Sequence, residues 1–234
     1  MAKSDHKARE QRILDAAAEL FAHYGYDKTA VSDIAREAGV SQGGIYLHFD
    51  SKEALFEALL IREMRTYAES WLQRLDADPK GGTIAGMYRT MLYALNASPF
   101  MTAMFRQDRR VFGSYLRKPG NFFQHFQGGG RPSPRFEFVQ LMQEAGAIRQ
   151  DLNPKVVTHI MNMLAYGLVA MDEVVPAEEI PPMEDLIEGI ADFMDRALTP
   201  DDGGNQEAGK AIIRQISDAA RQQFEHMSHP VREE

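Results

Sequence analysis

Apolar residues recur along most of the chain at spacings of three and four, and no stretch alternates convincingly over the length of a β-strand. The longest such stripe begins at Leu55 and continues to Leu75. It stops at residues 76–82, where two aspartates, a proline and two glycines predict a loop. We therefore expect an all-α protein.

Capping residues and helix breakers divide this pattern into successive helices. Gly25 ends the first helix, and Asp50 opens the longest one, with Glu53 three residues later as in a capping box. The segment 154–174 is apolar on nearly all sides, so it should contact neighbours on two faces. The predicted helices cover about 7–23, 31–38, 41–49, 51–75, 83–97, 100–116, 122–126, 134–145, 154–174, 182–198 and 206–226.

Residues 31–49 predict two short helices joined by a turn that contains Gly39. Small and apolar side chains, among them Ala35 and Ile45, supply a buried face that lets the two helices cross closely. This is the helix-turn-helix pattern, in which the second helix enters the major groove of DNA. Helical hairpins with such turns are common, so the pattern alone is moderately specific.

The second of these helices carries candidate DNA contacts. Ser41 is its predicted N-cap, which directs free N–H groups and the positive end of the helix dipole outward. Gln42 has the amide geometry that reads adenine, and Tyr46, His48 and Lys52 are spaced to reach phosphates. As an alternative, Tyr46 and His48 serve as packing residues at the edge of a three-helix unit.

The stretch from Ile13 to Leu60 resembles the TetR-type transcriptional regulators. The matching segments are 13–21 (Ile-Leu-Asp-Ala-Ala-Ala-Glu-Leu-Phe), 25–26, Thr29, 34–35, 38–41 (Ala-Gly-Val-Ser), 45–46, 48–49 and 52–55 (Lys-Glu-Ala-Leu). The resemblance implies a homodimeric repressor with an N-terminal DNA-binding domain and a C-terminal domain for ligand binding and dimerisation. The DNA-binding residues that we expect are Thr29, Ser32, Ser41, Gln42, Gly43, Gly44, Tyr46, His48 and Lys52.

The chain departs from the family's pattern at three positions. Ala30 stands where a threonine or serine is usual, Gln42 where a basic residue is frequent, and Gly44 where Thr, Ser or Ala is common. Glycines at 43 and 44 allow a close approach to DNA but leave fewer side chains to specify bases.

We expect an N-terminal three-helix DNA-binding domain over 1–51 and a helical bundle for ligand binding and dimerisation over 52–200. Residues 52–75 form its connecting helix, and 201–234 form a linker and an additional C-terminal helix that packs against the body or a partner subunit.

Composition narrows the class of protein. The chain has 234 residues, no cysteine and a formal net charge of −8. The missing thiols exclude disulfides and thiolate metal sites, and the longest apolar run, residues 163–171, is about half a membrane span. The polar residues 1–12 lack the apolar core of a secretory signal. We expect a cytoplasmic protein with no membrane partner.

Charge is distributed unevenly along the chain. Residues 100–150 carry 8 basic and 3 acidic side chains, whereas residues 151–202 carry 2 basic and 12 acidic ones. The basic 106–118 stretch either pairs with the acidic 172–195 region, within a subunit or across a dimer, or holds a carboxylate or phosphate of an amphipathic effector.

The second half of the chain is dense in methionine and aromatic residues. Such residues are more often core than pocket, but together they favour an adaptable cavity for a hydrophobic or amphipathic effector. The candidate pocket residues are Tyr88, Met91, Asn96, Met104, Phe105, Phe112, Phe122, Phe126, Met142, Asn162 and Tyr166.

The apolar helices 154–174 and 182–198 are the candidates for dimerisation, because two copies of the pair would form a four-helix bundle about a two-fold axis. The candidate interface residues are Ile160, Leu164, Leu168, Met183, Leu186, Ile187, Ile190 and Met194.

Signs of catalysis are weak. Residues 39–43 spell Gly-x-Ser-x-Gly, but that motif needs a strand before the serine and here a helix is predicted. His226 and His229 lack an obvious third ligand, so we expect no metal site, no cofactor and no enzymatic activity.

The sequence favours a ligand-responsive regulator that leaves a near-palindromic DNA operator when an effector binds, and activator action also agrees with it. The alternative is a helical small-molecule carrier with a vestigial helix-turn-helix.

Overall fold

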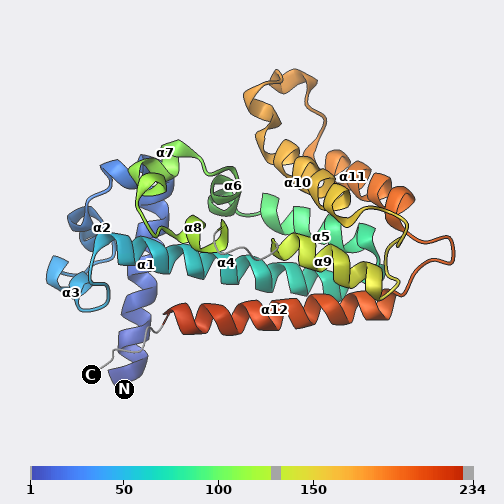
Figure 1. The fold of residues 1–234 in the computed structure, drawn as a ribbon. Helices are drawn as coiled ribbons and strands as arrows, with labels where there is room; N and C mark the ends of the chain where they lie inside the picture. Colours follow the sequence, from blue (N-terminus) through green and yellow to red (C-terminus); the bar gives the residue numbers. More distant parts are fainter. Residues whose placement is uncertain (1, 128–132, 229–234) are drawn as a thin grey trace. The chain divides into compact units, whose positions relative to one another are not determined.

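The computed structural model describes residues 2–127 and 133–228, and every secondary-structure element in these ranges is helical (Figure 1). The predicted all-α fold is thereby confirmed. None of the helices in the described ranges is long and apolar enough to span a membrane. The α-helices are α1 (Ala2–Lys28), α2 (Val31–Glu37), α3 (Gln42–Tyr46), α4 (Lys52–Ala77), α5 (Ile84–Asn96), α6 (Pro99–Arg106), α7 (Arg109–Phe112), α8 (Phe122–Gln127), α9 (Pro134–Glu144), α10 (Pro154–Ala170), α11 (Met183–Leu198) and α12 (Gln206–Ser228), and the 3₁₀ helices are η1 (Gly113–Arg117), η2 (Met171–Glu173) and η3 (Ala177–Glu179).

The single helix expected over residues 100–116 is wrong, because the chain forms α6, α7 and η1 there. Gln107 and Gly113 take positive φ values of 50° and 49°, which a continuous helix does not contain. A Cβ atom on Gly113 would lie 2.2 Å from the carboxylate of Asp27, so glycine is required for the approach of η1 to α1. The backbone N–H of Ser114 donates to that carboxylate at 3.0 Å.

The described residues form two compact units. Unit 1 contains those of 1–64 and 99–129, and unit 2 contains those of 65–98 and 130–234. The helix α4 is continuous and contributes its first half to unit 1 and its second half to unit 2. Packing therefore groups α6, α7 and α8 with the N-terminal helices, although the sequence assigned their residues to the ligand-binding domain.

An aromatic cluster forms the core of unit 1. Phe56 on α4 is fully buried, and its ring centroid lies 4.7 Å from that of Phe21 and 4.9 Å from those of Tyr26 and Tyr115. Phe112 lies at 5.6 Å in an edge-on arrangement. Because these rings come from α1, α4, α7 and η1, the burial of Phe56 holds four elements together.

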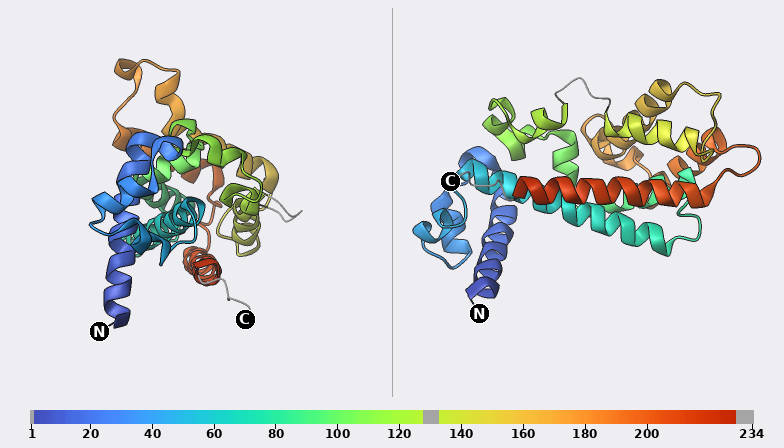
Figure 2. Two further views of the ribbon diagram at one scale, coloured as in Figure 1. Left: turned by 90° about the vertical axis from the view of Figure 1, so that its left-hand side faces the viewer. Right: turned by 60° about the horizontal axis from the view of Figure 1, so that its bottom comes forward.

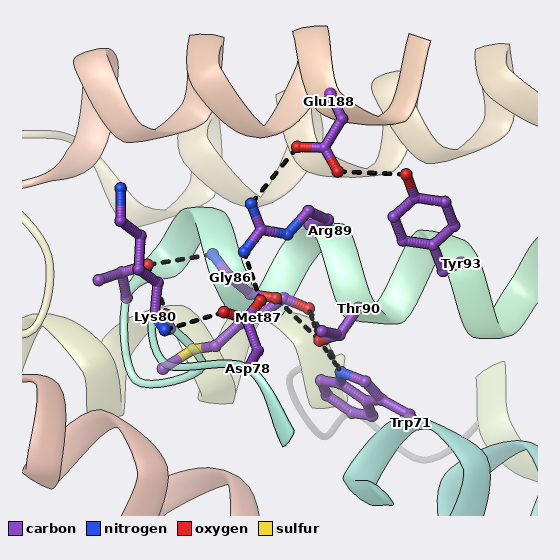
Figure 3. A network of polar contacts seen from close by, with 10 residues as sticks. Trp71, Asp78, Lys80, Gly86, Met87, Arg89, Thr90, Tyr93 and Glu188 are labelled. Atoms are coloured by element: carbon purple, nitrogen blue, oxygen red, sulfur yellow. Dashed lines mark hydrogen bonds and ion pairs between the residues drawn. The ribbon is translucent and has the colours of Figure 1, made fainter. Parts of the chain in front are cut away.

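In unit 2, α5 packs against α11, and polar contacts connect the two helices (Figure 3). The guanidinium of Arg89 on α5 pairs with Asp78 and, at 3.3 Å, with Glu188 on α11. The hydroxyl of Tyr93 donates to the same Glu188 at 3.1 Å. The indole N–H of Trp71 on α4 donates to the α5 backbone at Met87 at 3.2 Å, so one network spans three helices.

The C-terminal helix α12 packs against α9 inside unit 2 (Figures 1 and 2). Ile213 is buried, and Arg214 pairs with Asp76 at 2.8 Å. A Cβ on Gly209 would lie 2.6 Å from the carbonyl oxygen of Gly82, so the helix lies directly on the α4–α5 loop. The described part of α12 thus packs on the body of its own subunit, which was one of the two arrangements expected.

Candidate nucleic-acid interface

The helices α2 and α3 are joined by a tight turn. The N–H of Ala38 donates to the carbonyl of Ile34, and that of Val40 donates to Ala35, both at 2.9 Å. Gly39 has a φ of +65°, the left-handed conformation in which glycine ends helices with little strain. The turn is therefore fixed by backbone hydrogen bonds and one glycine, as the helix-turn-helix pattern requires.

Ser41 caps α3, because its hydroxyl oxygen accepts the N–H of Gly44 at 3.0 Å. Ile45 faces the core and is buried, whereas Gln42 is exposed and Tyr46 is 47% exposed. The helix ends at Tyr46, three residues earlier than predicted. Its outer face therefore presents an amide, a phenol and a capped N-terminus, which suits contact with base edges and phosphates.

The two glycines of α3 have different surroundings. A Cβ on Gly43 would meet only the Ser41 hydroxyl oxygen at 4.0 Å, so this position is open. A Cβ on Gly44 would lie 3.3 Å from that same oxygen, tighter than an ordinary contact. Gly44 thus leaves room for the cap, and exposed Gly43 lets another molecule approach the backbone closely.

Two of the expected DNA contacts, Thr29 and Ser32, precede the turn and differ in exposure. Thr29 is buried, and its hydroxyl donates to the carbonyl of Gly25 at 2.8 Å, across the kink where Gly25 has a φ of 79°. This hydroxyl therefore has its partner inside unit 1, and the expected contact of Thr29 with DNA stays a prediction. Ser32 is exposed in the first turn of α2 and remains a candidate.

Lys52 lies in a charged cluster around Tyr26. Its ammonium is 4.3 Å from the centre of the Tyr26 ring, and the Tyr26 hydroxyl donates to Glu53 at 2.8 Å. Lys118 from the segment after η1 pairs with the same Glu53. Burial lowers the pKa of Lys52 and raises that of Tyr26 to about 12. Sequence reasoning missed this cluster, because Lys118 is far from the others along the chain.

His48 is half-buried just beyond α3, against the N-terminal part of α1. Its ring centroid lies 4.0 Å from that of His6. Burial, and then the nearby His6, lowers the pKa of His48, so its imidazole is neutral at neutral pH. It therefore offers no positive charge to a phosphate at that pH, although an N–H contact stays available.

The helix α2 begins without a side-chain cap, because Ala30 occupies the N-cap position with an extended backbone, φ −94° and ψ 149°. Replacing Ala30→Ser should supply the missing acceptor and raise the free energy of unfolding by about 1 kcal/mol. Thermal denaturation followed by circular dichroism at one fixed protein concentration measures the change. Ala30→Val is the control, since it leaves the cap empty, and an equal rise in both variants would contradict the explanation.

The expected effector-pocket residues are divided between the two units. The hydroxyl of buried Tyr88 donates to the carbonyl of Met161, whereas Asn96 and Tyr166 are exposed within unit 2. An open hollow of about 530 Å³ lies elsewhere, between Glu19 and Glu37, and none of the expected residues lines it. The cavity stays a prediction. Met104, Phe105, Phe112 and Phe122 lie in unit 1, Tyr88, Met91, Asn96, Met142, Asn162 and Tyr166 lie in unit 2, and the side chain of Phe126 lies outside the described residues.

The expected dimer-interface residues fall into two groups, one buried within the subunit and one at least partly exposed. Ile187 and Met194 are buried, because α11 packs its apolar stripe against α5 within unit 2, and Leu168 is buried as well. These three side chains are covered within the subunit, and the interface to which the sequence assigned them stays a prediction. Ile160 is exposed, and Leu164, Met183, Leu186 and Ile190 are partly exposed. The sequence overlooked further exposed apolar side chains on the same two helices, namely Val156, Met163, Tyr166 and Phe193.

The two readings of the basic 106–118 stretch also stay predictions. Arg110 pairs with Asp108 in its own segment, at 2.7 Å, and Lys118 pairs with Glu53. In the acidic 172–195 region, Glu188 pairs with Arg89. Each of these ion pairs satisfies a group within its own unit.

Comparison with known proteins places the helix-turn-helix in a family. Residues 13–59 match the profile described as bacterial regulatory proteins, tetR family. The A-factor receptor protein of Streptomyces griseus is 29% identical over 192 residues, which are 73% of this chain and 69% of that protein. A helix-turn-helix-type transcriptional repressor of Mycobacterium tuberculosis is 28% identical over 71% of this chain and 83% of its own length.

The fold agrees with that of solved regulators. The crystal structure of the transcriptional regulator FadR from Bacillus subtilis, in complex with stearoyl-CoA, superposes with a TM-score of 0.57. The superposition covers 79% of this chain and 96% of that one at 18% sequence identity, so it shows a shared fold. The similarity therefore extends well beyond residues 13–59 in structure.

Proposed function

We propose that this chain is a transcriptional repressor of the TetR type, which a small molecule releases from DNA. The observation that carries the proposal is the capped, outward-facing α3, which lies within the segment that matches the family. Its site of action is the cytoplasm, where the bacterial chromosome lies. The relatives compared above are named as regulators or receptors, which agrees with a protein that is not an enzyme.

Local geometry supports DNA binding more than bulk charge does. Residues 1–50 carry 6 basic and 8 acidic side chains, so attraction by net charge is weak. The free N–H groups of α3, the amide of Gln42 and the phenol of Tyr46 supply directed contacts instead. Two such helices in a dimer would enter successive major grooves about 34–36 Å apart on a near-palindromic operator.

A symmetric dimer requires a surface that two copies share. On α10, Ile160, Met163 and Tyr166 are exposed, and Met163 is 61% exposed. On α11, Phe193 is 62% exposed, and Gly189 presents no side chain. Exposed apolar patches of this kind mark interaction sites, and two pairs of helices bury them as a four-helix bundle. We place the dimer interface on these outer faces of α10 and α11.

A hydrophobic or amphipathic effector is supported by composition and by the relatives. Met91 and Met142 belong to a core rich in methionine, which repacks around ligands of varied shape. One relative is named the A-factor receptor protein, and FadR was solved with stearoyl-CoA. An effector releases DNA only through a higher affinity for the conformation that does not bind DNA.

A gel-shift assay with DNA that flanks the chain's own gene tests operator binding. Tyr46→Ala should weaken specific binding by about tenfold or more, because a lost DNA contact costs about 1–3 kcal/mol and a dimer loses it twice. Tyr24→Ala is the matched control, since Tyr24 is an exposed tyrosine of α1 at 55% exposure. Absence of specific, salt-sensitive protection in the unaltered protein would rule out the regulator.

A second experiment separates the repressor from a small-molecule carrier. Molecules retained by the purified protein are identified by mass spectrometry and added back to the gel shift. A repressor releases its DNA, whereas a carrier binds the molecule and never protects the operator. Trp71 is the only tryptophan, and its indole N–H is hydrogen-bonded to the backbone of α5. Its fluorescence therefore provides a signal in unit 2 for titration with the retained molecule.

A further inference from the structure

Two imidazoles and a carboxylate meet beside the end of α3. His6 and Glu10 lie four residues apart on one face of α1, and His48 follows α3. One ligand atom from each of the three lies within 4.8 Å of the other two. The sequence predicted no metal site, because nothing in its spacing brings residue 48 to residues 6 and 10.

His48 has a nitrogen that lacks a partner. Its Nδ1 is buried and makes no hydrogen bond to any described residue. Buried polar atoms are nearly always satisfied, by a protein group, a water or an ion, so this nitrogen is available as a ligand atom. The ring of His6 lies against that of His48 with centroids 4.0 Å apart, which places a second imidazole beside it.

We propose that His6, Glu10 and His48 bind a divalent transition-metal ion of the zinc class. Two imidazoles and one carboxylate form a donor set that zinc accepts, with further positions left to water. Ligands of one tetrahedral zinc lie roughly 3.3 Å from one another, given metal–ligand bonds of about 2.0–2.1 Å. Because His6 is exposed on the first turns of α1, its side chain has the freedom to close the remaining distance.

Charges of both signs lie near the three side chains. Arg9 is the basic neighbour of this cluster on α1, and its guanidinium interacts with the carboxylate of Asp5 at 3.6 Å. The Glu10 carboxylate supplies a negative charge within the site. A bound ion would connect His6 to His48 and thereby strengthen the attachment of the chain at the end of α3 to α1.

Metal binding is measured on the full chain after dialysis against EDTA, with Zn²⁺ by calorimetry and with Co²⁺ by its visible absorption. His6→Gln should weaken Zn²⁺ binding by at least tenfold, because loss of a direct ligand exceeds the tenfold to hundredfold loss typical of outer partners. Zn²⁺ should also raise the Tm of the unaltered protein more than that of the variant. The controls are His23→Gln, on the same helix, and the double variant His226→Gln with His229→Gln.

These measurements contain no DNA, so their result does not depend on whether the protein is a repressor. A tenfold loss confined to His6→Gln supports the site. No Zn²⁺ binding by the unaltered protein, or equal affinity in His6→Gln, overturns it, and so does a loss seen in the control variants instead. If circular dichroism shows that His6→Gln does not fold, Glu10→Gln is judged by the same criterion.

Discussion

Replacing Phe56 by alanine is expected to lower the free energy of unfolding by about 3–5 kcal/mol. Phe56 is fully buried and touches rings from α1, α7 and η1, among them Phe21, Phe112 and Tyr115. The substitution removes the ring that these elements share and leaves a cavity that they cannot fill without separating. Urea denaturation followed by circular dichroism, at one fixed protein concentration, measures the loss.

Leu47→Ala is the matched control for that substitution. Leu47 belongs to the same unit and is also apolar, but it is 76% exposed, so its truncation should change stability by less than about 0.5 kcal/mol. Equal losses in the two variants would show that the aromatic cluster does not hold unit 1 together. A loss confined to Phe56→Ala confirms that it does.

The double variant Ile160→Glu with Met163→Glu is expected to convert a dimer into monomers. Both side chains are exposed on α10, so the folded subunit tolerates carboxylates there. In a two-fold interface each substitution occurs in both subunits, so it buries two new carboxylates. Each unpaired buried charge costs several kcal/mol. The dissociation constant should therefore rise on the order of 10³-fold, which sedimentation velocity over a range of concentrations detects.

Gln215→Glu provides the comparison, because it adds a carboxylate to an exposed position of α12, outside the two helices to which we assign the interface. It should leave the dimer intact. Dimers that persist in the double variant would place the interface elsewhere, and a protein that is monomeric without any substitution would exclude the symmetric DNA-binding mode. The double variant should also lose operator binding while Tyr46 and Gln42 remain unchanged.

Much of the candidate site was accessible from local sequence. The order of Ala38, Gly39 and Ser41 between two short apolar faces predicted the turn, and the structure contains its positive φ and its cap. Capping and glycine chemistry act over a few residues, so they can be read without knowing the rest of the fold. The exposure of Gln42 and Tyr46 follows from the same helical period that buries Ile45.

Other parts of the site depended on contacts between distant segments. The sequence predicted Thr29 as a DNA contact, but packing within unit 1 buries its side chain. It likewise assigned the apolar stripe of α11 to a partner, although Ile187 and Met194 are buried within the subunit. A stripe shows only that a face is buried, and it carries no information about which neighbour covers it.

The all-α fold, the helix-turn-helix and its capped second helix were predictable from the amino-acid sequence, because they depend on periodicity and on residues a few positions apart. Only the tertiary structure grouped residues 99–127 with the N-terminal helices, since rings such as Phe112 meet Phe56, which is 56 positions earlier in the chain (112 − 56). The tertiary structure alone showed that His48 lies beside His6 and Glu10. Contacts between distant residues arise from packing of the whole chain, and no local pattern records them.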